Sequence, residues 1–121
     1  MTQDLQHHSF GKPDEVRNFP NGHLELIQTP DGEIGRAFFE PGWHWSKDVK
    51  PIAETEWCEV HHAGYQVQGI LHVKMSNGDE FDIHPGDVSS LPSGHDAWVV
   101  GDETVISIDW AGFKNYAKPK S

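Results

Sequence analysis

Apolar and polar residues alternate in short runs along most of this chain, which is the pattern of β-strands with one buried face. The longest such run is YQVQGILHVKM, residues 65–75. Its alternation predicts a strand with one apolar face that carries Tyr65, Val67, Leu71 and Val73.

Turn-forming residues separate the alternating runs. Pro-Asp-Gly at 30–32 lies between HLELIQT and EIGRAFFEPG, an order that predicts a β-hairpin. Asn77-Gly78 is the dipeptide preferred in tight type I′ turns, and it predicts a second hairpin that leads into EFDI. Three further short strands are expected at 88–92, 97–100 and 104–110.

Short strands that are joined by glycine- and proline-rich turns every eight to twelve residues or so are typical of a β-sandwich or barrel. No segment has a convincing helical period, and KDVKPIAETE (47–56) is expected to be a loop. We expect a single domain, divided into an N-terminal arm (1–18), a barrel (19–112) and a C-terminal tail (113–121). Because a chain of 121 residues builds only a small core, a homodimer is expected to bury a further face.

The charge of the chain restricts its partners. Nine basic residues against 19 acidic ones give a net charge of −10, which argues against nucleic acid or an anionic membrane as the main partner. The single cysteine excludes an internal disulfide. The start of the chain, MTQDLQHHSFGKPDEV, lacks the basic and apolar stretches of a secretory signal, and no apolar run is long enough to span a membrane, so a cytoplasmic location is expected.

The turn residues of the second half also stand in a recognisable order. A strand glycine is followed by a hairpin turn, a Pro-Gly-Asp turn and a Pro-x-Gly turn, at Gly69, Asn77-Gly78, Pro85-Gly86-Asp87 and Pro92-Ser93-Gly94. This order and spacing resemble the two-motif core of the cupin superfamily, and the resemblance covers residues 35–110 or so. It implies an all-β fold, a small jelly-roll barrel of six to eight strands that is often dimeric, with a pocket inside the barrel.

The metal-binding motifs of cupins are altered in this chain. The usual first motif is H-x-H followed by a glutamate that lies seven residues before a strand glycine. Counted from Gly69, that glutamate position holds His62, the second histidine position holds Cys58, and Glu56 lies two residues earlier. The histidine of the second motif would fall at Ala97.

Four residues are therefore candidate metal ligands. Glu56, Cys58 and His62 have the same strand parity, so an extended backbone would direct them to one face, whereas His61 would point away. His95, directly after Gly94, is the candidate from the second motif. A thiolate and imidazoles favour zinc, and the mixed set would also accept iron, nickel or manganese.

Two other interpretations of Cys58 remain open at this point. It would be a small buried thiol if His62 is hydrogen-bonded to some other neighbour. It would be a nucleophile with His62 as its base if a third group stabilises the pair and the thiol pKa is depressed.

Aromatic residues cluster around the same positions. Trp43 and Trp45 would share one side of a strand, and Trp57 and Trp98 adjoin the candidate ligands in sequence. With Tyr65 and Gln66 they are the candidate lining of a pocket for a small organic molecule, the alternative being ordinary core packing.

No phosphate-binding glycine loop, G-x-S-x-G elbow or H-E-x-x-H motif is present, so no nucleotide cofactor is expected. Two functions follow from the resemblance and the altered motif. One is a small metal-dependent enzyme of oxygenase, isomerase or lyase type, and the other is a ligand-binding or sensing module without catalysis. The fold alone does not select a reaction.

Overall fold

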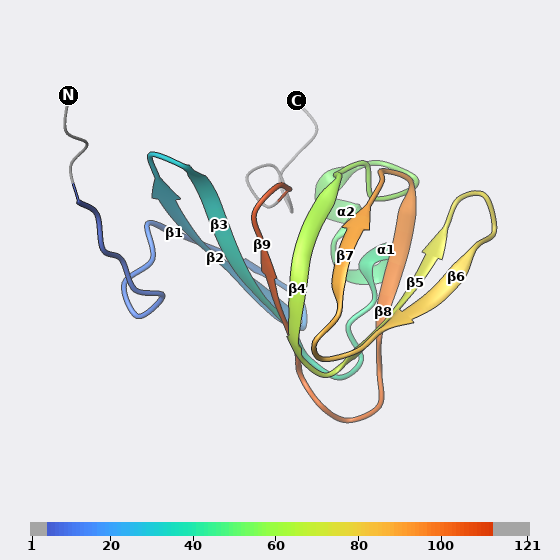
Figure 1. Cartoon of the computed structure of the whole chain (residues 1–121). Coiled ribbons are helices and arrows are strands. Elements are labelled where there is room, and N and C mark those ends of the chain that lie inside the picture. Colours follow the sequence, from blue (N-terminus) through green and yellow to red (C-terminus); the bar gives the residue numbers. More distant parts are fainter. Residues whose placement is uncertain (1–4, 113–121) are drawn as a thin grey trace.

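Two antiparallel β-sheets build the described part of the protein, residues 5–112, in a computed structural model (Figure 1). The larger sheet has the strand order β1-β2-β3-β9-β4-β7, and the smaller one has the order β6-β5-β8. The strands are β1 (Glu15–Phe19), β2 (Gly22–Thr29), β3 (Gly32–Phe39), β4 (His62–Gln68), β5 (Ile70–Met75), β6 (Glu80–Ile83), β7 (Val88–Leu91), β8 (His95–Val100) and β9 (Val105–Asp109). The all-β prediction is confirmed. The predicted tail, 113–121, lies outside the described residues.

Both predicted hairpins are present. β2 and β3 pair antiparallel around the Pro-Asp-Gly turn, with Thr29 opposite Gly32. β5 and β6 pair across Asn77-Gly78, where Gly78 has a φ of 100° that favours glycine. The three later strands also form, as β7, β8 and β9.

The expected apolar face of residues 65–75 is wrong in its first half. Tyr65 and Val67 are 42% and 46% exposed, whereas Leu71 and Val73 are buried. The cause is Gly69, which has a φ of 78° and separates β4 in the larger sheet from β5 in the smaller sheet. The inward parity of the chain changes at this break, so that Gln66 is the buried residue of β4.

Replacement of Gly69 by alanine is expected to lower the free energy of unfolding by about 2 kcal/mol, because strain at positive φ adds to overpacking. A Cβ at this position would lie 2.9 Å from both the carbonyl oxygen of Thr104 and Cα of Val105. Gly101→Ala is the matched control, since Gly101 has a φ of 86° but open space around its Cα. We expect the control to lose about 1 kcal/mol in urea unfolding. Equal losses at the two positions would contradict this account.

The segment 47–56 was expected to be a loop. Residues 45–53 form two single helical turns instead. These are α1 (Trp45–Asp48) and α2 (Lys50–Ala53). A turn of four residues is too short to display a helical period, which is why the sequence pattern does not reveal it. Trp45, the first residue of α1, and Trp43, two residues earlier, are both 2% exposed and belong to the core.

The N-terminal boundary of the barrel also differs from the prediction. β1 begins at Glu15, inside the predicted arm, and pairs with β2 from Glu15↔Leu26 to Phe19↔Gly22. Its side chains alternate between half-buried and exposed up to the buried Phe19, a pattern too short and too polar to stand out in the sequence.

The core lies between the two sheets. The most buried aliphatic residues on its strands come from both sheets, namely Leu24, Leu26, Ala37, Val73 and Val105, and Val49 between α1 and α2 is equally buried. Among the described residues, no helix has the length and apolar composition needed to cross a membrane.

Candidate metal centre

Cys58 and His95 are held side by side by their own backbones. They form an isolated antiparallel bridge, in which the amide of Cys58 donates to the carbonyl of His95 over 2.8 Å. The amide of Gly94 in turn donates to the carbonyl of Cys58 over 2.7 Å. Cys58 is therefore fixed at the start of β8, although it belongs to the segment that precedes β4.

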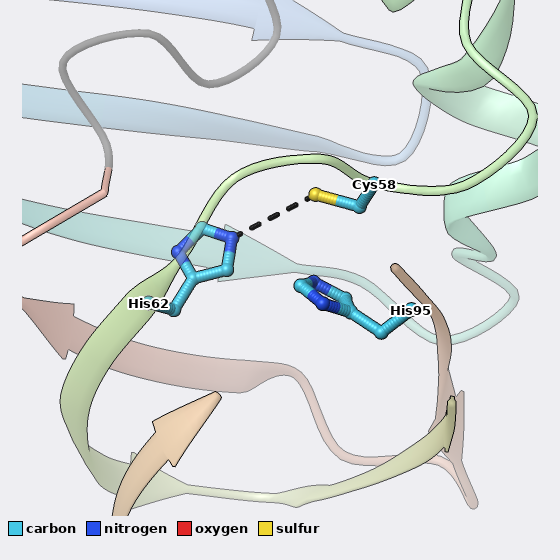
Figure 2. A group of neighbouring side chains, drawn as sticks. All are labelled: Cys58, His62 and His95. Atoms are coloured by element: carbon cyan, nitrogen blue, oxygen red, sulfur yellow. Dashed lines mark hydrogen bonds between the residues drawn. The ribbon is translucent and has the colours of Figure 1, made fainter. Parts of the chain in front are cut away.

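His62, the first residue of β4, completes a cluster with these two residues (Figure 2). One potential ligand atom from each of Cys58, His62 and His95 lies within 4.8 Å of the others. Cys58 Sγ and His62 Nε2 are 3.8 Å apart, the contact drawn as a dashed line in Figure 2. Three of the four predicted ligand residues thus converge.

The orientation of His62 is set by Asp109 at the end of β9. His62 Nδ1 lies 2.7 Å from Oδ2 of this carboxylate, which is 3% exposed as a residue. Because an ionised carboxylate only accepts hydrogen bonds, Nδ1 carries a proton, so that in the neutral ring it is Nε2 that has the lone pair, directed toward Cys58. The other oxygen of Asp109 accepts from the amides of Ala111 and Gly112, each at 2.7 Å.

His95 is held in a similar way by the main chain. Its Nδ1 donates to the carbonyl of Pro92 over 2.9 Å, which leaves Nε2 as the nitrogen with a lone pair. Burial, with the neighbouring His62 as a second cause, lowers the pKa of His95 to about 4. The imidazole is therefore neutral at pH 7, the form that binds metal ions.

Burial has the opposite effect on Cys58, whose pKa rises to about 12. The metal-free thiol is thus protonated at neutral pH. A nucleophilic cysteine needs a depressed pKa. Asp109 supplies the third group that a Cys-His pair would need, but the protonated, 2% exposed thiol does not fit that role.

The cluster fits a divalent transition metal. Zinc binds thiolate sulfur at about 2.3 Å and imidazole nitrogen at about 2.0–2.1 Å in tetrahedral geometry, which places the two donor atoms roughly 3.5 Å apart. The 3.8 Å between Cys58 Sγ and His62 Nε2 is close to this value. Both imidazoles are also tied through Nδ1 to a hydrogen-bond acceptor, the arrangement that metal-binding histidines usually show.

A cavity of about 70 Å³ opens beside the cluster, large enough for several water molecules. His62, His95 and Asp109 form one part of its wall. Ala97, at the position where the cupin motif would place a histidine, leaves this part of the wall open. The remaining lining is mostly apolar and comes from both sheets and the helical region: Phe39, Trp43, Trp45, Gly64, Gln66, Leu71, Ile83, Ser89, Leu91 and Ser107.

The fourth predicted ligand, Glu56, lies outside the cluster. Its side chain is 78% exposed and pairs with Lys50 at 3.2 Å. The parity argument for Glu56 is wrong because residues 56–61 do not form a regular strand, apart from the bridge at Cys58. His61 is exposed, as the register with Gly69 predicts.

Of the six predicted pocket residues, Trp43, Trp45 and Gln66 line the cavity. Trp57, Tyr65 and Trp98 do not. Tyr65 points outward because β4 has the opposite parity from the one expected. Trp98 alternates with the buried Ala97 and Val99. Its ring contacts those of His44 and His72, with ring centroids 4.7 and 4.6 Å apart and a tilt of 33° in each pair.

Asp109 is the main site residue that sequence reasoning missed. The available signal was the parity of TVISIDW, in which Val105, Ser107 and Asp109 alternate with two isoleucines. In the structure Val105 and Asp109 are buried, and Ser107 and Asp109 line the cavity. A carboxylate on an inward strand position indicates a partner, but the pattern does not identify His62 as that partner.

Comparison with known proteins identifies similar folds. No family model matches the chain, and no curated protein matches it either. A cupin-2 domain protein from Rhodospirillum rubrum is 17% identical, with 90% of this chain and 68% of that one covered and a TM-score of 0.57. For a cupin-like protein from Thermotoga maritima the identity is 18%, the coverage 92% and 81%, and the TM-score 0.56.

A mutant of oxalate decarboxylase from Bacillus subtilis is likewise similar. It is 18% identical with a TM-score of 0.59, and the match covers 85% of this chain and 29% of that one. The chain also spans only 30% of the length of CapF from Staphylococcus aureus, which it resembles at 19% identity. At these identities the likenesses show the fold alone.

Proposed function

We propose, on the premise that this chain has the cupin fold, that Cys58, His62 and His95 hold a divalent transition metal at the wall of the cavity. We further propose that the metal acts on a small organic molecule bound there. One observation carries this proposal, the convergence of three donor atoms within 4.8 Å beside a largely apolar cavity. The donor set favours zinc among the metals that it would accept.

Each residue has a distinct part in this function. Cys58, held by its bridge to His95, supplies a thiolate after losing its proton, and the two histidines supply neutral nitrogen donors. Asp109 holds His62 in the required tautomer. Phe39, Trp43 and Trp45 keep water away from the reacting molecule, which strengthens electrostatic effects in the cavity.

The chemistry assigned to the centre is Lewis acid catalysis. When bound, the metal would polarise a carbonyl-type oxygen of the ligand. Cys58 is buried and does not line the cavity, whereas the small side chain of Ala97 does. Three protein ligands would therefore leave one coordination position of the metal, on the cavity side, for that oxygen.

The proposal is tested by elemental analysis of protein purified without an affinity tag. We expect about one zinc or other transition metal ion per chain in the wild type and none in a Cys58→Ala, His62→Ala double variant. Glu56→Ala is the control, since its exposed carboxylate pairs only with Lys50 among the described residues, and it should keep the full metal content. A folded wild-type protein that takes up no metal after incubation with zinc would overturn the proposal.

A further inference from the structure

The charges around the proposed centre limit the kind of molecule that it binds. A divalent ion contributes two positive charges, while the Cys58 thiolate and the Asp109 carboxylate contribute one negative charge each. The two histidines are neutral donors. The metal-loaded centre, counted together with Asp109, therefore carries no net charge. None of these groups favours an anionic ligand.

The described lining of the cavity contains no cation that would compensate the charge of an anionic ligand. Within residues 5–112, no lysine or arginine lines the cavity. The charges that act on the Cys58 thiol come from Glu59, Asp96 and Asp109, all of them carboxylates. The chain as a whole has a net charge of −10. An anion that enters the cavity would lose its hydration and meet a negative potential.

The wall offers hydrogen bonds to an uncharged polar group instead. The hydroxyls of Ser89 and Ser107 lie among aromatic and aliphatic side chains, whereas the amide nitrogen of Gln66 already donates to the carbonyls of Gly69 and Ile83.

We propose that the ligand of this centre is a small uncharged molecule with a carbonyl-type oxygen, such as an amide, ketone or aldehyde, and that carboxylates and phosphates are disfavoured. This ligand class rests on the proposed metal site. It differs from the substrate in the name of oxalate decarboxylase, a protein with the same fold, because oxalate is a dianion.

The test compares two molecules of the same size and shape, propionamide and propionate. The protein is loaded with cobalt, whose visible spectrum responds to ligands at the metal, and each compound is titrated separately. We expect propionamide to reach half-saturation at a concentration about tenfold lower than propionate, because an uncompensated charge near Asp109 costs on the order of 1–2 kcal/mol. Thermal stabilisation by each compound provides a second measurement.

A variant that adds a cation to the wall sharpens the comparison. Ser89 lines the cavity from β7, the edge strand of the larger sheet, so Ser89→Lys is the substitution least disruptive to the core. We expect this variant to bind propionate more tightly than propionamide.

The outcomes separate the two proposals. Tighter binding of propionate than of propionamide by the cobalt-loaded wild type, or no response to either compound, overturns the ligand class and leaves the metal site standing. Failure of the folded protein to bind cobalt overturns the proposed function and the ligand class with it. An unchanged preference in folded Ser89→Lys would contradict the charge argument.

Discussion

Substitution of Asp109 by asparagine is expected to weaken zinc binding by about 10- to 100-fold, the usual effect of removing the partner of a metal-binding histidine. The reason is the tautomer of His62. An asparagine would present its NH₂ group to Nδ1, which would then accept a hydrogen bond, and the ring proton would move to Nε2. That nitrogen faces Cys58 in the structure, so its lone pair would no longer be available to the metal.

The same substitution should leave the fold largely intact. The carbonyl oxygen of asparagine can still accept from the amides of Ala111 and Gly112, as Oδ1 of Asp109 does. In the presence of a chelator, the free energy of unfolding of Asp109→Asn is therefore expected to lie within about 1 kcal/mol of the wild-type value. This separates a positioning role from a purely structural one.

Two measurements check the expectation. Competition with a chromophoric chelator gives the zinc affinity, and long-range ¹⁵N–¹H spectra of the metal-free protein identify the tautomer of His62. Asp82→Asn is the matched control, because Asp82 contacts Nδ1 of His72 at 2.6 Å on the far side of the smaller sheet. Zinc affinity of Asp109→Asn within about twofold of the wild type, or an equal loss in the control, would contradict the assignment.

A second large effect concerns the acid stability of the metal-free protein. His95 has a pKa of about 4 in the folded state because it is buried, against about 6.5 in the unfolded chain. A depressed pKa means that the unfolded state takes up a proton first as the pH falls. The stability associated with neutral His95 is fully present above pH 6.5, and it is lost between about pH 6.5 and 4.

The size of this loss follows from the difference between the two pKa values. It corresponds to about 3 kcal/mol of unfolding free energy. Urea unfolding with a chelator, repeated between pH 7 and 4, measures it. His95→Gln has no titrating ring, so its stability should fall by about 3 kcal/mol less over the same range. Parallel pH profiles for the two proteins would show that His95 is not held neutral by burial.

The fold was predictable because the signals that define it are local. Pro-Asp-Gly at 30–32 and Asn77-Gly78 form turns by their own conformational preferences, and the predicted hairpins and cupin fold are confirmed. Cys58 and His62 were also placed from local spacing, because the register was counted from Gly69. That glycine is conformationally required, so it is a reliable point of reference.

The parts that escaped prediction depend on contacts between distant segments. Asp109 meets His62 only because β9 pairs with β4, and one sequence does not reveal that pairing. The prediction for Tyr65 was wrong because it assumed one continuous strand through Gly69. The strand ends there, so the alternation of inward and outward residues does not continue from β4 into β5. Glu56 was misplaced because parity was applied to a segment that is not a strand.

The candidate metal cluster has ligands from both sheets, and this has a mechanical consequence. His62 belongs to the larger sheet and His95 to the smaller one, and the ladders of these sheets are separate. An ion held by both residues would join the sheets at the end where Cys58 bridges to β8. Such a cross-link fixes chain segments that are far apart in sequence, and it would limit how far the sheets separate at that end. The mixed ligand set would thus restrict the relative motion of the two sheets beside the cavity and also supply its chemistry.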